Sequence, residues 1–202
     1  MDLNFAELTT LERYKLLTGL VFPRPIAWVS TWGEDGVANC APYSFFNVFS
    51  SDPALLILGF GLHPNGALKD SLANIRRTNE FVVNLVDEST ANAMHISSEH
   101  FPPHVSEFEK SGLTAMPASL VRHPRIAEAP ACFECKVFQR LPINSGRELV
   151  IGEILLVHAR EGLIDPQSKR VSEELYQPIG RLYGDRYCTS RQRFNLPGPL
   201  PD

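Results

Sequence analysis

The stretch PIAWVSTWGEDGVANCAPYSFFNVFSSDPALLILGF, residues 25–60, carries most of the information about the fold. Two β-prone runs, 25–32 and 37–40, flank the loop Gly33–Gly36, and such runs around a loop that contains Gly and Asp predict a hairpin. Further apolar and aromatic runs lie on both sides of Ser51-Asp52-Pro53, where proline favours a break. The region therefore predicts consecutive antiparallel strands joined by short turns.

Helical patterns appear in three other segments. Residues 9–20 carry apolar side chains at the spacing of one helix face, with Thr9 or Thr10 as the cap. Asp70–Arg76 is predicted to be an amphipathic helix with its first residue as the cap. The segment 87–109 is less regular and is expected to combine helix and loop. These helices are too few to alternate with every strand.

Two long strands are predicted near the end of the chain, at 131–141 and 147–159, with Pro142–Gly146 as the turn between them. Because few helices intervene between strands, a parallel doubly wound sheet is excluded. The prediction is a mainly β fold: an antiparallel barrel of six to eight strands with a few covering helices.

Composition limits the size and the partners of the protein. At 202 residues and 22.6 kDa, residues 1–202 are expected to form one domain, with a leading helix in 1–20 and a C-terminal tail at 188–202. A net charge of −4 argues against a nucleic-acid partner. The longest apolar run, 54–62, falls short of the roughly 18 to 20 residues of a membrane span, and no secretory signal is visible. We therefore expect a cytoplasmic protein.

The cysteines and histidines do not suggest a metal site. Cys132 and Cys135 form a CxxC, but they lie on a predicted strand, where residues three apart point to opposite faces. They are therefore interpreted as buried or half-buried thiols. Three closely spaced histidines have no cysteine or carboxylate pair to complete a ligand set, and prolines interrupt the segment, so they are interpreted as surface or lid residues: His95, His100 and His104.

The informative polar residues lie in the segment Asn39–Asn47 and in Lys69-Asp70-Ser71, whereas the common nucleotide-binding and hydrolase motifs are absent. The first segment offers aromatic rings together with hydroxyl and amide groups, as a planar heteroaromatic ligand requires. The second begins a helix, where N–H groups and a lysine favour a phosphate. Structural alternatives stay open: a barrel strand bonded to neighbouring loops, and a capped helix with a solvated lysine.

Several motifs in one order give the sequence a family resemblance that spans about Arg24 to Tyr187. They are Arg24–Thr31 (RPIAWVST), Ala41–Asn47 (APYSFFN) followed by Ser51-Asp52-Pro53, Lys69-Asp70-Ser71 with Asn74-Ile75, Phe81–Asn84 (FVVN) and Ile151–Ile154 (IGEI). Together they resemble the flavin reductase-like, FMN-binding split-barrel family. The resemblance implies an antiparallel split barrel that forms a homodimer and holds FMN at the subunit interface.

The resemblance also implies roles for single residues. Isoalloxazine and ribityl contacts are expected from Ser30, Thr31, Asn39, Ala41, Pro42, Tyr43 and Ser44, phosphate contacts from Lys69, Asp70 and Ser71, and further cofactor contacts from Asn47 and Arg181. Many flavin-reducing relatives carry a histidine near the nicotinamide position, where this sequence has Arg147. Arg147 and His158 are therefore candidates for the nicotinamide side.

Three functions are compatible with these observations. In the first, the protein passes hydride from NADH or NADPH to flavin, which supplies a partner monooxygenase or another electron acceptor. In the second, it is a flavoredoxin-like protein that keeps FMN as an electron carrier without efficient NAD(P)H turnover. The third is a β-barrel interaction module without flavin. A reductase of this kind needs no dedicated catalytic acid or base, because the cofactor carries the chemistry.

Overall fold

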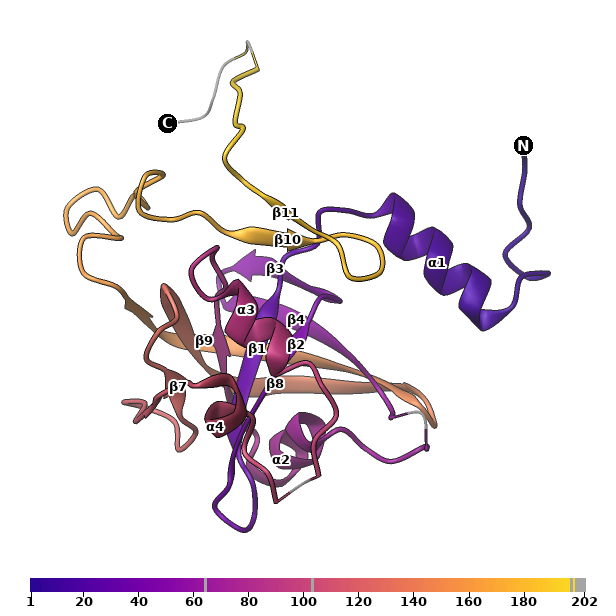
Figure 1. Ribbon diagram of the computed structural model, residues 1–202, viewed down its shortest axis with the longest axis horizontal. Coiled ribbons are helices and arrows are strands. Elements are labelled where there is room, and N and C mark those ends of the chain that lie inside the picture. The colour runs from indigo at the N-terminus through magenta and orange to yellow at the C-terminus, as the bar shows by residue number, and fades with distance from the viewer. Residues whose placement is uncertain (64, 103, 197, 199–202) are drawn as a thin grey trace.

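The fold is dominated by one antiparallel sheet of seven strands in the order β2-β1-β5-β8-β9-β4-β3 (Figure 1). The computed structural model describes residues 1–63, 65–102, 104–196 and 198. The helices are α1 (Thr10–Leu20), α2 (Asp70–Thr78), α3 (Ala91–Ile96) and α4 (Glu107–Ser111). The sheet strands are β1 (Ala27–Trp32), β2 (Ala38–Tyr43), β3 (Phe46–Ser51), β4 (Ala54–Gly61), β5 (Glu80–Asn84), β8 (Ala131–Asn144) and β9 (Arg147–Ala159). Two-stranded sheets are formed by β6 (Ala115–Met116) with β7 (Arg125–Ile126), and by β10 (Ile179–Arg181) with β11 (Tyr187–Thr189). The predicted mainly β, antiparallel architecture is confirmed.

The predicted hairpin at the start of the barrel is formed by β1 and β2. The turn between them is closed by a hydrogen bond from Gly33 N to Val37 O at 2.8 Å. Gly36 has a φ of 80°, in the left-handed region that glycine adopts without steric cost. Local turn chemistry therefore fixes the register of the first strand pair.

The segment from Ala41 to Asn47 is not one continuous strand. It breaks at Ser44 and Phe45, so that β2 and β3 become the two opposite edges of the same sheet. Gly59 N donates a 2.8 Å hydrogen bond to Phe45 O, which ties this corner to β4. Because the two edge strands follow each other directly in the chain, the sheet curls into a barrel at this corner.

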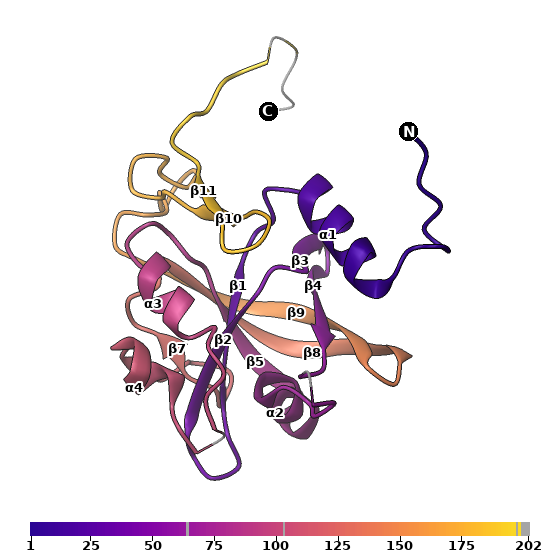
Figure 2. The same cartoon turned by 45° about the vertical axis from the view of Figure 1, so that its right-hand side comes forward.

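Apolar clusters fill both sides of the sheet. Figure 2 shows α2 on one side and α3 with α4 on the other. Leu72 and Ile75 of α2 belong to the cluster that contains Cys135, whereas Met94 of α3 belongs to the cluster that contains Cys132. The two thiols therefore face opposite sides, as predicted. Burial raises the pKa of Cys132 to about 12, so its thiol stays protonated.

The ends of several elements differ from their predicted positions. Thr9 caps α1 with a capping box, as expected. In α2 the N-cap position is Lys69, whose side chain makes no capping hydrogen bond, and Asp70 is the first helical residue, so the prediction of Asp70 as the cap is wrong. β8 continues to Asn144, so the predicted five-residue turn is shorter. β11 occupies the start of the predicted tail 188–202, and residues 197 and 199–202 of that tail lie outside the described residues.

α1 projects from one side of the sheet (Figure 1). Its predicted apolar face is exposed: the side chains of Leu11, Leu17 and Leu20 are 60%, 44% and 75% accessible. Arg24 anchors the end of this helix, because its guanidinium donates to the carbonyls of Thr18 and Leu182 at 2.9 Å each. Among the described helices, none combines the length and the apolar character needed to cross a membrane.

Candidate functional site

A cavity of about 390 Å³ opens at the corner between β2 and β3. Its walls come from α1, the corner itself, β4, the start of α2, α3, β9 and the β10–β11 pair. The lining residues are Tyr14, Ile26, Pro42, Tyr43, Ser44, Phe45, Gly59, Gly61, Leu62, Lys69, Met94, Ser98, Arg147, Arg181 and Tyr187. A cavity of this size lies within the about 300 to 1,000 Å³ that small-molecule sites occupy.

Aromatic rings form the middle of this cavity. Tyr43 is 6% exposed and packs its ring on Phe60, with 4.6 Å between centroids. Burial raises the pKa of Tyr43, so its hydroxyl stays protonated. The rings of Tyr14 and Phe45 lie 6.5 Å apart, which brings the exposed helix α1 against the corner. The corner thus presents flat apolar surface together with a phenol donor.

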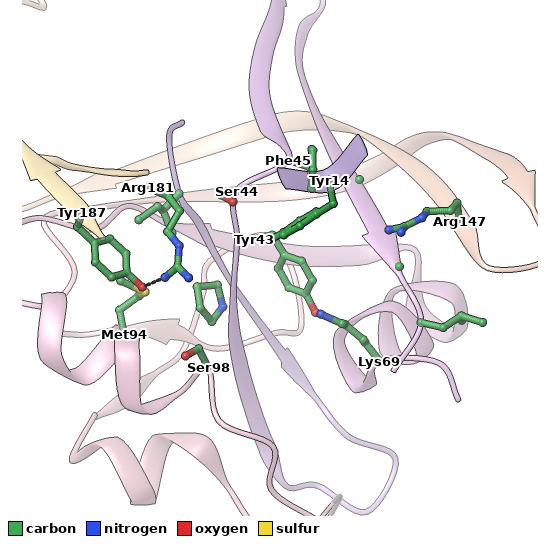
Figure 3. Close-up of a pocket in the computed structure, with 15 residues that line it drawn as sticks. Tyr14, Tyr43, Ser44, Phe45, Lys69, Met94, Ser98, Arg147, Arg181 and Tyr187 are labelled. Atoms are coloured by element: carbon green, nitrogen blue, oxygen red, sulfur yellow. Dashed lines mark hydrogen bonds between the residues drawn. The ribbon is translucent and has the colours of Figure 1, made fainter. Parts of the chain in front are cut away.

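Cationic side chains lie at the two ends of the cavity, with Tyr43 between them (Figure 3). At one end, Arg181 donates to the hydroxyl of Tyr187, and its guanidinium carbon lies 4.6 Å from the centroid of that ring. At the other end are Lys69 and Arg147. Burial and the charge of Arg147 both lower the pKa of Lys69. The described carboxylates do not line this cavity.

A buried polar network lies behind the cavity and joins four elements. Asn39 Oδ1 accepts hydrogen bonds from Thr31 Oγ1 at 3.2 Å and from Ser71 Oγ at 2.9 Å. Asn39 Nδ2 donates to Glu107 Oε2 at 3.1 Å, and Asn74 Nδ2 donates to Thr31 Oγ1 at 3.1 Å. The network fixes β1, β2, α2 and α4 relative to one another.

A smaller cavity of about 140 Å³ adjoins the first and shares with it Pro42, Tyr43, Lys69 and Ser98. It is also lined by Asn39, Ala41, His63, Asp70, Ser71, Ser97, Glu99, His100, Phe101 and Glu107. The rings of His63 and His100 lie 4.6 Å apart across its mouth. Burial, together with the nearby charge of Asp70, raises the pKa of Glu107, and Asp70, Glu99 and Glu107 all line this cavity. This second cavity is therefore acidic.

The structure divides the predicted site residues into three groups. Pro42, Tyr43, Ser44, Lys69, Arg147 and Arg181 line the larger cavity. Asn39, Ala41, Asp70 and Ser71 line the smaller one, and Thr31 is fully buried behind it. Ser30, Asn47 and His158 line neither cavity. A direct contact of any of these residues with a cofactor stays a prediction.

The third group has other partners. Ser30 faces the opposite side of β1, where its Oγ donates to Pro124 O and accepts from Asn84. His158 Nε2 lies 2.5 Å from Oε1 of the buried Glu134. It stands eleven residues along β9 from Arg147, roughly 35 Å away at the rise of an extended strand. The two candidates for the nicotinamide side therefore cannot serve one site in one chain.

Several lining residues were not predicted from the sequence. Gly59 and Gly61 alternate with bulky residues along β4, and two glycines at this spacing are a signal for close approach at one face of a strand. Tyr14, Met94 and Tyr187 carried no such signal, because only the tertiary fold brings them to the corner. His95, His100 and His104 are exposed, as predicted, and in the described part of the chain no group of three potential metal ligands is gathered.

The chain was compared with known families and structures. Residues 18–180 match the flavin reductase like domain. The structure superposes on the 2-nitrobenzoate 2-nitroreductase of Pseudomonas fluorescens with a TM-score of 0.91 and 38% identity, covering 100% of this chain and 99% of the other.

Two further structures are similar. Nitrilotriacetate monooxygenase component B from Bacillus cereus gives a TM-score of 0.91 and 33% identity, covering 97% of this chain and 98% of the other. A split barrel protein of Shewanella frigidimarina NCIMB 400 gives a TM-score of 0.83 and 22% identity, covering 98% of this chain and 100% of the other. This similarity supports the fold alone. The family match confirms the resemblance seen in the motifs, and the protein belongs to the flavin reductase-like family of flavin-binding split-barrel oxidoreductases.

Proposed function

We propose that the protein binds FMN in the cavity at the β2–β3 corner and transfers hydride from NADH or NADPH to that flavin. The observation that carries this proposal is the arrangement of the larger cavity. Aromatic side chains occupy its middle, and the cations Lys69 and Arg147 lie together at one end. A phosphorylated planar ring system needs a flat apolar wall and a cationic end in this order.

The bare surface of β4 also fits a flat cofactor. A Cβ atom added to Gly59 would lie 3.2 Å from Phe45 Cβ, and one added to Gly61 would lie 2.7 Å from the guanidinium of Arg147. Glycine at these two positions keeps the cavity open where larger residues would fill it. The residues present therefore fit FMN, with Tyr43, Ser44 and Phe45 against the ring and Lys69 with Arg147 toward the phosphate.

Bound FMN would supply the hydride-accepting chemistry itself, so the protein's task is to bind and orient. The protonated hydroxyl of Tyr43 and the hydroxyl of Ser44 are donors for polar edges of the ring. Phe45 and Tyr14, whose rings lie 6.5 Å apart, would cover one side of the bound ring. Holding the nicotinamide and the flavin in the right geometry would convert their bimolecular reaction into an effectively unimolecular one.

The final electron acceptor is part of the same proposal. Two of the similar structures carry names that state a nitroaromatic reductase and a component of a monooxygenase. We therefore consider free flavin that serves a partner monooxygenase, and a nitroaromatic acid, as acceptors. The same reduced FMN could pass electrons to either acceptor. A cytoplasmic location stays a prediction from the sequence.

We also propose that the active form is a homodimer with FMN at the subunit interface. The exposed apolar side chains of α1 and β3 support this, because Leu17, Leu20, Val48 and Phe49 are each more than two fifths accessible. Exposed apolar side chains that gather into a patch mark interaction sites. Size-exclusion chromatography with light scattering is expected to give twice the chain mass. A monomer at micromolar concentration and in the presence of FMN would reject the dimer.

The test of function uses purified protein, FMN and each reduced nicotinamide in turn. We expect a yellow complex that oxidises NADH or NADPH. The oxidation is measured as the loss of absorbance of the reduced nicotinamide. Retained FMN with very slow oxidation would identify the flavoredoxin-like electron carrier instead. A colourless protein whose melting temperature FMN does not raise would leave the interaction module as the remaining function.

A further inference from the structure

A chain of three polar side chains leads from the larger cavity to the surface of the protein. Tyr187 of β11 and Arg181 of β10 line the end of the cavity opposite Lys69, as Figure 3 shows. Arg181 donates a hydrogen bond to the hydroxyl of Tyr187. The same hydroxyl lies 3.5 Å from Nδ1 of His95, which belongs to α3. One phenol oxygen therefore connects the three side chains.

The outer part of this chain lies in a third cavity of about 460 Å³, which shares Met94 and Tyr187 with the larger one. His95 lines the third cavity but not the larger one, and it is exposed to solvent. Tyr187 thus stands between the two cavities. A proton taken up from water at His95 can reach the larger cavity through the Tyr187 hydroxyl.

The hydrogen atoms on these groups determine the direction of each hydrogen bond. A guanidinium only donates and stays protonated, so Arg181 occupies a lone pair of the Tyr187 oxygen. The phenol has a single O–H, which it donates to His95 when Nδ1 is unprotonated. When Nδ1 carries a proton, His95 becomes the donor, and the O–H of Tyr187 is free to point into the larger cavity. Protonation of His95 therefore makes Tyr187 a donor toward a molecule bound there.

Arg181 supports the loss of a proton from this oxygen. Its guanidinium carbon lies 4.6 Å from the centroid of the Tyr187 ring, so its charge is held against both the ring and the hydroxyl. Its ion-pair partner, Asp185 at 3.6 Å, is 92% exposed, and water screens such a pair. Because hydrogen bonds from a charged donor are stronger than neutral ones, Arg181 stabilises negative charge that develops on the phenol oxygen.

Reduction of a nitroaromatic acceptor consumes such a proton. Conversion of a nitro group to a nitroso group takes up one hydride and one proton. The hydride, supplied by the reduced flavin of the proposed function, brings the electron pair. One N–O bond breaks, and the oxygen leaves as water with the hydrogen of the hydride and the added proton. A cavity that reduces such an acceptor therefore needs a proton donor.

We propose that Tyr187 is the proton donor of the larger cavity and that His95 returns the proton to it from solvent. The inference rests on the proposed function and deepens it, because it names the class of acceptor: molecules that take up a proton together with the hydride, as nitroaromatic acids do. After each turnover the Tyr187 oxygen takes a proton from His95, which is protonated again by water. Arg181 is a positioning residue that holds the phenol oxygen.

The experiment follows the two half-reactions of the FMN-loaded protein separately, by stopped flow without oxygen. In the first, NADH or NADPH reduces the flavin. In the second, the reduced protein is mixed with 4-nitrobenzoate, whose reduction consumes a proton, or with ferricyanide, which accepts an electron without a proton. The variants are Tyr187→Phe, which keeps the ring against Arg181, and His95→Gln.

Two matched controls replace the same residue types outside the chain of hydrogen bonds. Tyr183→Phe changes an exposed tyrosine in the loop between β10 and β11, and His104→Gln changes an exposed histidine. Both positions lie outside the lining of the three cavities. The two controls should match the wild type in both half-reactions.

We expect Tyr187→Phe to slow oxidation by 4-nitrobenzoate about a hundredfold or more, the size of a lost general acid. Flavin reduction and oxidation by ferricyanide should stay within about threefold of the wild type, because neither needs this proton. His95→Gln should slow the nitrobenzoate reaction about tenfold, and imidazole in the buffer should restore it because the position is exposed.

The pH profile tests His95 itself. In the wild type the rate with 4-nitrobenzoate should fall toward alkaline pH, where His95 is unprotonated and accepts the Tyr187 proton. This fall should be lost in His95→Gln. The other charged and titratable groups around His95 remain in that variant: Glu88, Asp185, Tyr187, Cys188 and, through the Tyr187 hydroxyl, Arg181. A wild-type rate and pH profile in His95→Gln would remove the histidine from the relay.

Three outcomes would overturn the inference while the proposed function stands. In the first, Tyr187→Phe slows oxidation by 4-nitrobenzoate and by ferricyanide equally, which indicates a role in packing. In the second, Tyr187→Phe reacts with 4-nitrobenzoate at the wild-type rate. In the third, the reduced wild type reacts with ferricyanide but not with 4-nitrobenzoate. A wild type whose flavin neither nicotinamide reduces would instead reject the proposed function, and reduction by dithionite would then still allow the second half-reaction to be measured.

Discussion

Ser71 Oγ donates a 2.9 Å hydrogen bond to Asn39 Oδ1, and this contact joins the first turn of α2 to strand β2. Both residues are less than a tenth exposed. We expect Ser71→Ala to lower the free energy of unfolding by about 1–2 kcal/mol, because Asn39 loses a buried donor. FMN affinity should change less than about threefold. Urea unfolding and flavin titration check both values, and a large loss of FMN affinity at unchanged stability would place Ser71 on the phosphate.

Lys69 is one of three predicted site residues that line both cavities, with Pro42 and Tyr43. Its Nζ lies 5.3 Å from the centroid of the Tyr43 ring. Lys69→Ala removes a charge-assisted contact and should weaken FMN binding by about 1–2 kcal/mol, roughly tenfold. Isothermal titration at low salt measures this. Lys136→Ala, an exposed lysine outside both cavities, serves as the control. An unchanged dissociation constant would remove Lys69 from the site.

His158 pairs with the buried carboxylate of Glu134 at the far end of β9 from Arg147. His158→Gln should therefore leave the KM for NADH and the affinity for FMN unchanged. It should cost about 1–2 kcal/mol of stability, since Glu134 loses one of its partners but keeps the N–H groups of Ser119, Leu120 and Val121. Steady-state kinetics and thermal unfolding distinguish the two roles. A raised KM would restore His158 as a nicotinamide candidate.

His123 is fully buried, accepts a 2.8 Å hydrogen bond from Trp32 N at Nδ1, and lies 2.8 Å from Thr78 Oγ1. Burial lowers its pKa to about 4. Between this value and the ordinary pKa of about 6.5, the unfolded state binds the proton and the folded state does not. The neutral His123 therefore contributes its full share to the free energy of unfolding above a pH of about 6.5. This contribution is lost, by on the order of 3 kcal/mol, as the pH drops to about 4.

The measurement for His123 is denaturant unfolding across this pH range. In His123→Gln the fall between neutral pH and about 4 should be much smaller, because no group titrates at that position. The absolute stability of the variant is not the readout. An equal slope in the wild type and the variant would show that another group causes the pH dependence.

Gly152 of β9 lies against the buried ring of Phe81. A Cβ atom at this position would stand 2.5 Å from Phe81 Cζ and 3.3 Å from Leu56 Cδ1. Gly152→Ala should therefore destabilise the fold by about 1–3 kcal/mol through overpacking. Gly19→Ala is the matched control, because nothing lies within 4 Å of its Cβ position in α1. The control should be neutral or slightly stabilising, and equal effects of the two substitutions would contradict the packing argument.

Sequence reasoning succeeded where local chemistry decides the structure. The β1–β2 hairpin follows from Gly36 and the runs beside it, and the α1 cap follows from Thr9 with Glu12. The opposite facing of Cys132 and Cys135 follows from strand alternation alone. The family motifs lie in these same locally determined elements, which is why they predicted the fold.

The features that the sequence did not show depend on contacts between distant segments. The break at Ser44 is stabilised by a hydrogen bond from Gly59, which no local pattern indicates. The N-cap position of α2 falls on Lys69, not Asp70, and the hydroxyl of Ser71 bonds to Asn39 of β2. The approach of Arg147 to Lys69 requires the register between β4 and β9. These three contacts determine the candidate site.

The corner at Ser44 and Phe45 has a consequence for ligand release. The two outermost strands of the sheet, β2 and β3, meet there, and the cavity is lined by Pro42 and Tyr43 of β2 and by Ser44 and Phe45 of the link to β3. A molecule bound in the cavity would therefore hold the end of β2 and the link to β3 together. Release of the bound molecule is then coupled to separation of the end of β2 from the start of β3. Amide hydrogen exchange along β2 and β3 would slow when the ligand binds. The exchange rate would therefore report how much of the cavity is occupied, even for a colourless ligand.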